Sequence, residues 1–433
     1  MSTAVTDDPT SLSARVAAAA IREGTLSSRD LVNACLSRVN SRDPSIKAWH
    51  FLDPSLPRKE AEARDGAPQA ARGVLHGVPV GVKDIVDTVD MPTACNSPIY
   101  RDKPARGDAS CVTALRQAGG IVLGKTATTE FAAFTPTQTR NPHNPGHTPG
   151  GSSSGSAAAV ADFQVPLAIG TQTAGSIIRP AAFCGVVGFK PTFGTIDRTG
   201  VKPFADALDT VGVFARTVDD AALFAGAMAG WPEMRRGRAP VAPKRVLIVR
   251  APAWERISEE SEQAVNAAGR IFEAAGVPVE EAMMPDGFDA LNEVHDILHV
   301  YEGHRALAYE RAQHGESLSQ GLRSHFERAE AKSFNTYLAA RQTQEAWFQR
   351  FDAELEAGEV VLTASAAGEA PEGLEFTGDP AFARTWTLLH LPCITLPQGR
   401  GPKNLPLGVQ LVGPRWDDLS LLGAARWLAE KLA

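Results

Sequence analysis

Two serines in small-residue surroundings, Ser152 and Ser176, are the side chains whose setting best suits nucleophilic chemistry. Ser152 lies in a Gly/Ser-rich segment, and Ser176 directly follows Gly175. Because glycine has no Cβ, backbone N–H groups in such segments can approach a reacting atom closely. Four N–H groups at the second serine could stabilise an oxyanion at about 3–4 kcal/mol per donor. They belong to Thr173, Ala174, Gly175 and Ser176. The pattern therefore indicates attack by a hydroxyl on a carbonyl.

Longer stretches around these serines carry recognisable motifs. They read GVPVGVKD at 77–84, PGGSSSGS at 149–156, GTQTAGSIIRP at 170–180 and CGVVGFKP at 184–191. Together they resemble the lysine, serine and nucleophile motifs of the amidase-signature family of serine hydrolases, with aryl acylamidases and urethanases among its members. The resemblance is strong over residues 70–215, weaker over 383–433 and slight over 230–360.

The resemblance implies a Ser–Ser–Lys triad. Ser176 would attack the carbonyl, and Ser152, after a cis peptide bond from Gly151, would relay protons between Ser176 and Lys83. Lys83 would act as the base, which requires a pKa about 3 units below the usual 10.4, equivalent to about 4 kcal/mol. Burial in a strand can supply that shift, since desolvation disfavours the charged amine. A relay that also protonates the departing nitrogen suits amides.

Two positions depart from the family pattern. The usual Asp-Thr-Gly-Gly before the nucleophile is replaced by Gln172, Thr173, Ala174 and Gly175, which removes a carboxylate near the nucleophile loop. The family's arginine commonly stands two residues after the nucleophile. Here Ile178 takes that place and Arg179 follows it, so the arginine's role is not carried over.

Other patterns suggest other chemistry with less support. Residues 151–155 fit the G-x-S-x-G nucleophile elbow, but coil rather than a buried strand precedes them. Residues 119–126 fit a P-loop, but their variable positions form an apolar strand. His295 and His299 have a metal-ligand spacing, and His304 follows, yet the HExxH pattern is not met. We therefore expect no cofactor and no metal.

The segments around these motifs alternate between two kinds of pattern. Short apolar runs predict buried strands, at 78–82, 121–123, 165–169, 186–189, 211–214, 246–249, 360–363, 393–396 and 407–412. Helical patterns lie at 10–40, where Ser27 or Ser28 predicts an N-cap, and at 109–118, 156–162, 217–229, 258–274 and 418–432. The expected fold class is α/β, the amidase-signature fold: a mixed, mostly parallel central sheet covered by helices on both faces.

We expect one amidase domain over residues 1–433. Its parts are N-terminal helices over 1–70, the signature core over 70–215, a Pro/Arg-rich surface connection over 231–245, a helical cap over 290–357, and closing strands with a C-terminal helix over 383–433. A loop is expected over 365–376.

Composition excludes several classes of protein. Apolar residues make up 43% and charged residues 21%, which is typical of a globular protein. The formal net charge is −7 with no basic stripe, so we expect no nucleic-acid partner. The five cysteines are scattered, which favours a reducing compartment. With no signal peptide or membrane span in the sequence, we expect a cytoplasmic protein without a membrane partner, as a monomer or homodimer.

The sequence favours a stand-alone amidase that hydrolyses the C–N bond of a neutral aryl or alkyl amide or carbamate. The loop 131–147, with Phe131 and Phe134 as candidate substrate-binding residues, and the mostly apolar segment 290–350 are expected to form the pocket. The alternative is the glutamine-hydrolysing subunit of a tRNA-dependent amidotransferase. Gln172 and the slight resemblance over 230–360 weigh against that alternative.

Overall fold

A large mixed β-sheet organises the chain. The computed structural model describes residues 8–101, 104–250 and 253–432. Its 11-stranded sheet has the order β1-β3-β2-β4-β6-β5-β10-β11-β9-β7-β8. The strands are β1 (Trp49–Phe51), β2 (Pro79–Lys83), β3 (Ile121–Thr126), β4 (Leu167–Gln172), β5 (Val187–Lys190), β6 (Thr210–Ala215), β7 (Val246–Ile248), β8 (Val279–Glu281), β9 (Val360–Ala364), β10 (Cys393–Arg400) and β11 (Pro406–Val412). Every apolar run that predicted a strand forms one.

The direction of the strands changes along the sheet. Parallel pairs join β3 to β2 and β2 to β4 near one end, and β9 to β7 and β7 to β8 at the other. Between them, β4, β6, β5, β10, β11 and β9 pair in antiparallel fashion. The predicted mixed α/β sheet is confirmed, but it is not mostly parallel: among the described strands four pairs are parallel and six, including β1 with β3, are antiparallel.

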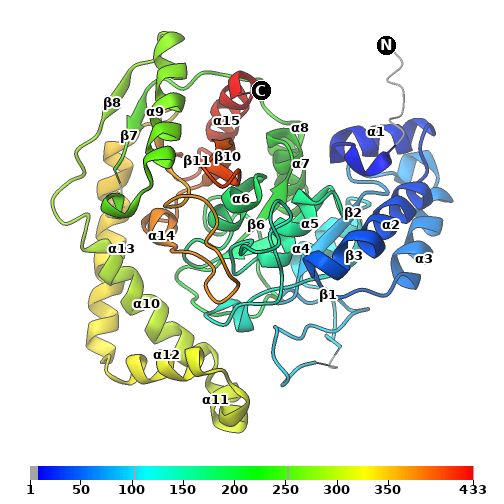
Figure 1. Ribbon diagram of the computed structural model, residues 1–433, viewed down its shortest axis with the longest axis horizontal. Coiled ribbons are helices and arrows are strands. Elements are labelled where there is room, and N and C mark those ends of the chain that lie inside the picture. Colours follow the sequence, from blue (N-terminus) through cyan, green and yellow to red (C-terminus); the bar gives the residue numbers. More distant parts are fainter. Residues whose placement is uncertain (1–7, 102–103, 251–252, 433) are drawn as a thin grey trace.

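Helices cover both faces of this sheet (Figure 1). The helices before residue 290 are α1 (Ala14–Glu23), α2 (Ser28–Ile46), α3 (Ser55–Asp65), α4 (Ser110–Gln117), α5 (Ser154–Ala161), α6 (Ile178–Cys184), α7 (Val218–Met228), α8 (Pro232–Arg236) and α9 (Glu259–Ala274). Alternate residues of β4 point to opposite sides, because Leu167 and Ile169 join one buried cluster and Ala168 joins the other. As predicted, the side chain of Ser27 caps α2 by accepting from the N–H of Asp30 at 3.0 Å.

Four helices fill the region that the sequence predicted as helical over 290–357. They are α10 (Leu291–Ala306), α11 (Ala308–His314), α12 (Gln320–Glu330) and α13 (Phe334–Glu354). Figure 1 shows this group at one side of the molecule, opposite α1–α3. After β9 the chain runs without a regular element to α14 (Ala381–Leu388) and finishes in α15 (Asp418–Leu432).

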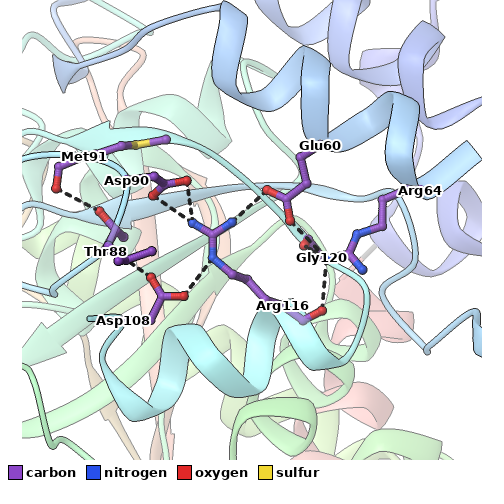
Figure 2. A network of polar contacts seen from close by, with 9 residues as sticks. Glu60, Arg64, Thr88, Asp90, Met91, Asp108, Arg116 and Gly120 are labelled. Atoms are coloured by element: carbon purple, nitrogen blue, oxygen red, sulfur yellow. Dashed lines mark hydrogen bonds and ion pairs between the residues drawn. The ribbon is translucent and has the colours of Figure 1, made fainter. Parts of the chain in front are cut away.

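An ionic network joins α3, α4 and the segment after β2, at the end of the sheet that contains β1, β3 and β2 (Figure 2). The Arg116 guanidinium on α4 contacts the carboxylates of Glu60 on α3 at 2.8 Å, Asp90 at 2.9 Å and Asp108 at 3.0 Å. Asp90 and Asp108 lie in the segment between β2 and α4. One side chain thus ties two helices to the chain that leaves β2.

Candidate active site

Lys83 is the last residue of β2, and its amine is fully buried. Its Nζ donates to Ser152 Oγ at 2.8 Å and to Thr171 Oγ1 at 2.7 Å, and it lies 3.5 Å from the Thr171 carbonyl oxygen. No carboxylate forms an ion pair with Lys83 among the described residues. Burial lowers the pKa of Lys83 to about 7. Near neutral pH, a large fraction of this amine is therefore uncharged and able to accept a proton.

The serine-rich segment enters the site through the N-terminus of α5. The peptide bond from Gly151 to Ser152 is cis, as the family resemblance implied. The neighbouring hydroxyls are engaged elsewhere: Ser153 donates to the Thr171 carbonyl at 3.2 Å, and Ser154 donates to the Gly150 carbonyl at 2.8 Å. Ser152 is therefore the member of this run that faces Lys83.

Ser176 lies in the tight connection between β4 and α6. The side chain of Gln172 stabilises that connection through hydrogen bonds. The Gln172 side-chain oxygen accepts from the N–H groups of Ile177 at 2.8 Å and Ile178 at 3.0 Å. Its amide nitrogen donates to Thr387 Oγ1 on α14 at 2.9 Å. An amide oxygen can accept from backbone N–H groups as a carboxylate does. The loop therefore keeps an internal brace without the carboxylate.

The N–H groups of residues 173–176 are available at this connection. Within the described part of the chain, none of these four groups donates a hydrogen bond to protein. The carbonyl groups behind them are held, because Thr173 O accepts from His295 Nε2 at 2.9 Å and Ala174 O accepts from Thr387 Oγ1 at 2.9 Å. Fixed carbonyls orient the N–H groups of the same loop, which is what an oxyanion site requires.

Both serines line one cavity of about 300 Å³. Ser152 and Ser176 form part of its wall, together with Phe134, His295 and Arg179. No hydrogen bond joins the two serine hydroxyls in the described part of the chain. Catalytic hydrogen bonds are often loose without substrate and tighten when it binds. The cavity thus brings Ser152 and Ser176 into one wall, and the buried Lys83 amine reaches Ser152 from outside the lining.

Of the two phenylalanines that the sequence predicted to bind substrate, the structure places Phe134 in the cavity wall and Phe131 in the core. Phe134 lines the cavity and is 43% exposed. Phe131 is buried in the core with its ring edge-on to Tyr100, and it does not line the cavity. Several apolar residues of the cap, such as Leu298, are likewise core residues. The cavity is in fact lined by charged residues that the sequence could not place: Arg179, Asp296, Arg328, Glu375 and Arg384.

The histidines lie near the site without forming a metal centre. His295 is buried with a pKa lowered by burial to about 3, so it is neutral and donates to Thr173. His299 stacks on His295, with ring centroids 5.7 Å apart, and His304 contacts Arg311. Over the described ranges, no cluster of three His, Cys, Asp or Glu side chains could hold a metal ion. None of the helices in those ranges is long and apolar enough to cross a membrane.

Three polar side chains of the site were missed by sequence reasoning. Thr171 accepts from Lys83, His295 holds the carbonyl of Thr173, and Thr387 holds both Gln172 and Ala174. Thr171 lies inside the nucleophile motif near the end of β4, and the parallel pairing of β4 with β2 places it close to the end of β2 that carries Lys83. This pairing is the signal that could have identified it. His295 and Thr387 come from distant helices, and nothing local in the sequence marks them.

Comparison with known proteins places this geometry in a family. A family model described as "Amidase" matches residues 30–422. A glutamyl-tRNA(Gln) amidotransferase subunit of Anaeromyxobacter sp. (strain K) is 33% identical over 477 aligned positions, covering 97% of this chain and 96% of that protein. The similarity thus extends through 230–360, where the motifs alone had suggested little resemblance.

Solved structures agree in fold. The native peptide amidase from Stenotrophomonas maltophilia superposes with a TM-score of 0.84 at 28% identity, covering 98% of this chain and 97% of that one. A 6-aminohexanoate cyclic dimer hydrolase complexed with substrate superposes with a TM-score of 0.85 at 25% identity, with 98% of each chain covered. With the family match spanning the sheet and both serines, the chain belongs to the amidase-signature family.

Proposed function

We propose that the chain hydrolyses an amide C–N bond through an acyl-enzyme on Ser176, with Ser152 and Lys83 as its proton relay. The observation that carries this proposal is the 2.8 Å hydrogen bond from the buried Lys83 amine to Ser152 Oγ, at a cavity that Ser176 also lines. A pKa of about 7 leaves that amine able both to take and to return a proton near neutrality.

The steps follow from this arrangement. Ser152 accepts the proton of Ser176 Oγ while its own proton passes to Lys83 Nζ, and Ser176 Oγ bonds to the carbonyl carbon. The N–H groups of residues 173–176 face the carbonyl oxygen as it gains charge. Lys83 then returns its proton through Ser152 to the departing nitrogen, so that an amine or ammonia leaves. Water then attacks the acyl carbon and gives its proton through Ser152 to Lys83. The bond to Ser176 Oγ breaks, the relay returns that proton to Ser176 Oγ, and the acid leaves.

The amide donor in this proposal is glutamine or a close analogue. The named relatives at about 30% identity are glutamyl-tRNA(Gln) amidotransferase subunits, and they favour this alternative over the stand-alone amidase that the sequence suggested. The similarity through residues 230–360 removes one argument against it. The charged cavity also suits glutamine better than a neutral anilide. In this setting a tRNA-binding partner would receive the ammonia.

A stand-alone amidase remains the second candidate, because the solved structures that resemble the chain include a peptide amidase and a cyclic dimer hydrolase. The purified chain alone should be assayed on glutamine, an anilide, a carbamate and a peptide amide, with Ser176→Ala as the control. Turnover of glutamine that a partner protein increases supports the first candidate. Turnover of neutral amides without glutaminase activity supports the second.

For either candidate, we expect Ser176→Ala to lower the rate of amide hydrolysis by at least about 10³-fold. Activity that survives in this variant would disprove the assignment of Ser176 as nucleophile.

A further inference from the structure

Arg179 is a buried residue whose side chain lines the cavity of Ser152 and Ser176. It stands on the first turn of α6, three residues after Ser176, and only 6% of it is exposed. Its Nη2 donates to the Gly151 carbonyl at 2.6 Å and lies 3.4 Å from Thr377 Oγ1. These contacts fix the guanidinium plane beside the peptide bond that precedes Ser152.

The rest of this guanidinium has no protein partner. Arg179 Nε and Nη1 are buried and make no hydrogen bond in the described residues, and no carboxylate among them forms an ion pair with Arg179. A buried charge without a counter-charge is costly. Burial lowers the pKa of Arg179 to about 10, which still leaves it positive at neutral pH. The cavity wall therefore holds a fixed positive charge whose remaining donors need an acceptor.

A second unpaired cation lines the same cavity. Arg384 on α14 also has a buried Nε without a partner, and no ion pair forms to it within the described ranges. The other charges are better balanced. Arg328 pairs with Asp296 at 2.6 Å, and Asp379, just outside the lining, contacts Arg256. Glu375 lies at the exposed rim. Asp379 favours the charged forms of Arg179 and Arg384 from a distance, but neither arginine has an ion-pair partner among the described residues, and both line the cavity beside Ser176.

We infer that Arg179 and Arg384 form an anion subsite that binds a carboxylate of the substrate. The inference rests on the proposed function and names the substrate class: monoamides of short dicarboxylic acids, of which glutamine is an amino derivative. Charged donors on carboxylates make shorter and stronger hydrogen bonds than neutral pairs. The subsite would hold the carboxylate while the amide at the other end of the chain meets Ser176.

The position of Arg179 limits the length of that substrate. A Cβ built on Gly175, the residue before the nucleophile, would lie 3.4 Å from Arg179 Nη1. The guanidinium is therefore next to the loop that binds the reacting carbonyl. A carboxylate bound there can be separated from that carbonyl by only a few carbon atoms. Succinate and glutarate, the diacids left after hydrolysis of such monoamides, are suitable probes.

Binding to the inert Ser176→Ala protein tests the subsite without any turnover. Calorimetry with glutarate, succinate and the neutral diamide glutaramide should show glutarate or succinate binding at least about 10-fold more tightly than glutaramide, an advantage that salt weakens. Adding Arg384→Gln or Arg179→Gln should reduce this preference by about 10-fold or more. Arg179→Lys should keep part of it, since the charge remains.

Arg236→Gln in the same background is the matched control, because Arg236 is on α8 and does not line the cavity. It should bind the diacids unchanged. Arg384→Gln breaks no hydrogen bond of the described protein, so it keeps the test decisive if Arg179→Gln misfolds. Equal binding of diacid and diamide, or a preference that survives in Arg384→Gln and Arg179→Gln, overturns the inference. Diacid binding with the expected dependence in a protein that hydrolyses no amide would uphold the subsite and refute the proposed function.

Discussion

Lys83 is one of several buried lysines, and its partners set it apart. Lys125 forms an ion pair with Asp84 at 3.3 Å, and Lys190 donates to the Pro191 carbonyl at 3.0 Å. Lys83 has hydroxyl groups as its close partners, at Ser152 and Thr171. Hydroxyls can accept from a charged amine and donate to a neutral one, so they permit both protonation states. A carboxylate at the same place would hold the amine charged.

Activity should depend on pH through Lys83. Because its pKa is lowered to about 7, the neutral amine falls about tenfold per pH unit below that value, and kcat/KM should fall with it. The folded state also binds fewer protons than the unfolded state between pH 7 and the usual lysine pKa. Stability relative to Lys83→Met should therefore rise with pH across that window. A pH–rate profile and urea unfolding at several pH values measure both effects. A rate that is flat from pH 5 to 8 would contradict this role.

Gln172→Leu should lower both activity and stability. The change leaves the N–H groups of Ile177 and Ile178 without their acceptor, each at about 1–3 kcal/mol when buried, whereas the Thr387 hydroxyl keeps its other hydrogen bonds. We expect the free energy of unfolding to fall by about 2–6 kcal/mol and kcat to fall more than KM changes. Gln172→Glu, which keeps the acceptor, should retain more activity. Unchanged kcat in the leucine variant would show that the brace does not act on the nucleophile loop.

At the scale of the elements, close backbone packing places the serine segment. Gly155 on α5 lies where an added Cβ would be 2.0 Å from the Ala48 carbonyl oxygen and 2.4 Å from the Ala127 nitrogen. Its own N–H donates to the Ala127 carbonyl at 2.9 Å. The N-terminus of α5 therefore rests directly on the backbone that precedes β1 and follows β3. This contact fixes the segment that carries Ser152.

Gly155→Ala should displace the serine segment. Backbone cannot yield as a side-chain end can, so we expect a loss of about 1–3 kcal/mol or more in unfolding free energy and a reduced kcat. Gly107→Ala is the control, since nothing lies within 4 Å of its added Cβ. Thermal unfolding and steady-state kinetics compare the two variants. Equal stability of both would show that α5 moves to accommodate a methyl group.

The elements that position the triad were predictable because their sequences carry local signals. Apolar runs at 78–82 and 165–169 mark β2 and β4, although both strands extend beyond them to Lys83 and Gln172, and glycine-rich segments mark the two serine loops. The short strands β1 and β8 were not predicted, because three-residue strands at the sheet edges bury too little to leave a pattern. Arg179 and Arg384 show the same limit in the site, since their convergence depends on tertiary packing.

At the scale of the whole molecule, the packing of α3 and α4 beside β2 and β3 depends on a cluster of charged side chains around Arg116. Arg116 holds three carboxylates, from Glu60, Asp90 and Asp108, which would repel one another without it. Arg116→Gln should therefore lower the free energy of unfolding by about 1–3 kcal/mol and make stability more sensitive to salt, which screens the remaining carboxylates. Urea unfolding at low and high salt measures this loss. Arg236→Gln, with one exposed partner, should change little.

The hydrogen bond from Gln172 to Thr387 spans 215 residues of sequence. A ribosome makes the chain from its N-terminus, so Lys83, Ser152 and Ser176 all emerge long before α14. Thr387 and Arg384, which hold the nucleophile loop and line the cavity, are made only about 200 residues later. The nascent protein should therefore be inert towards amides until α14 docks. A chain cut before residue 381 should carry an intact triad sequence and no activity.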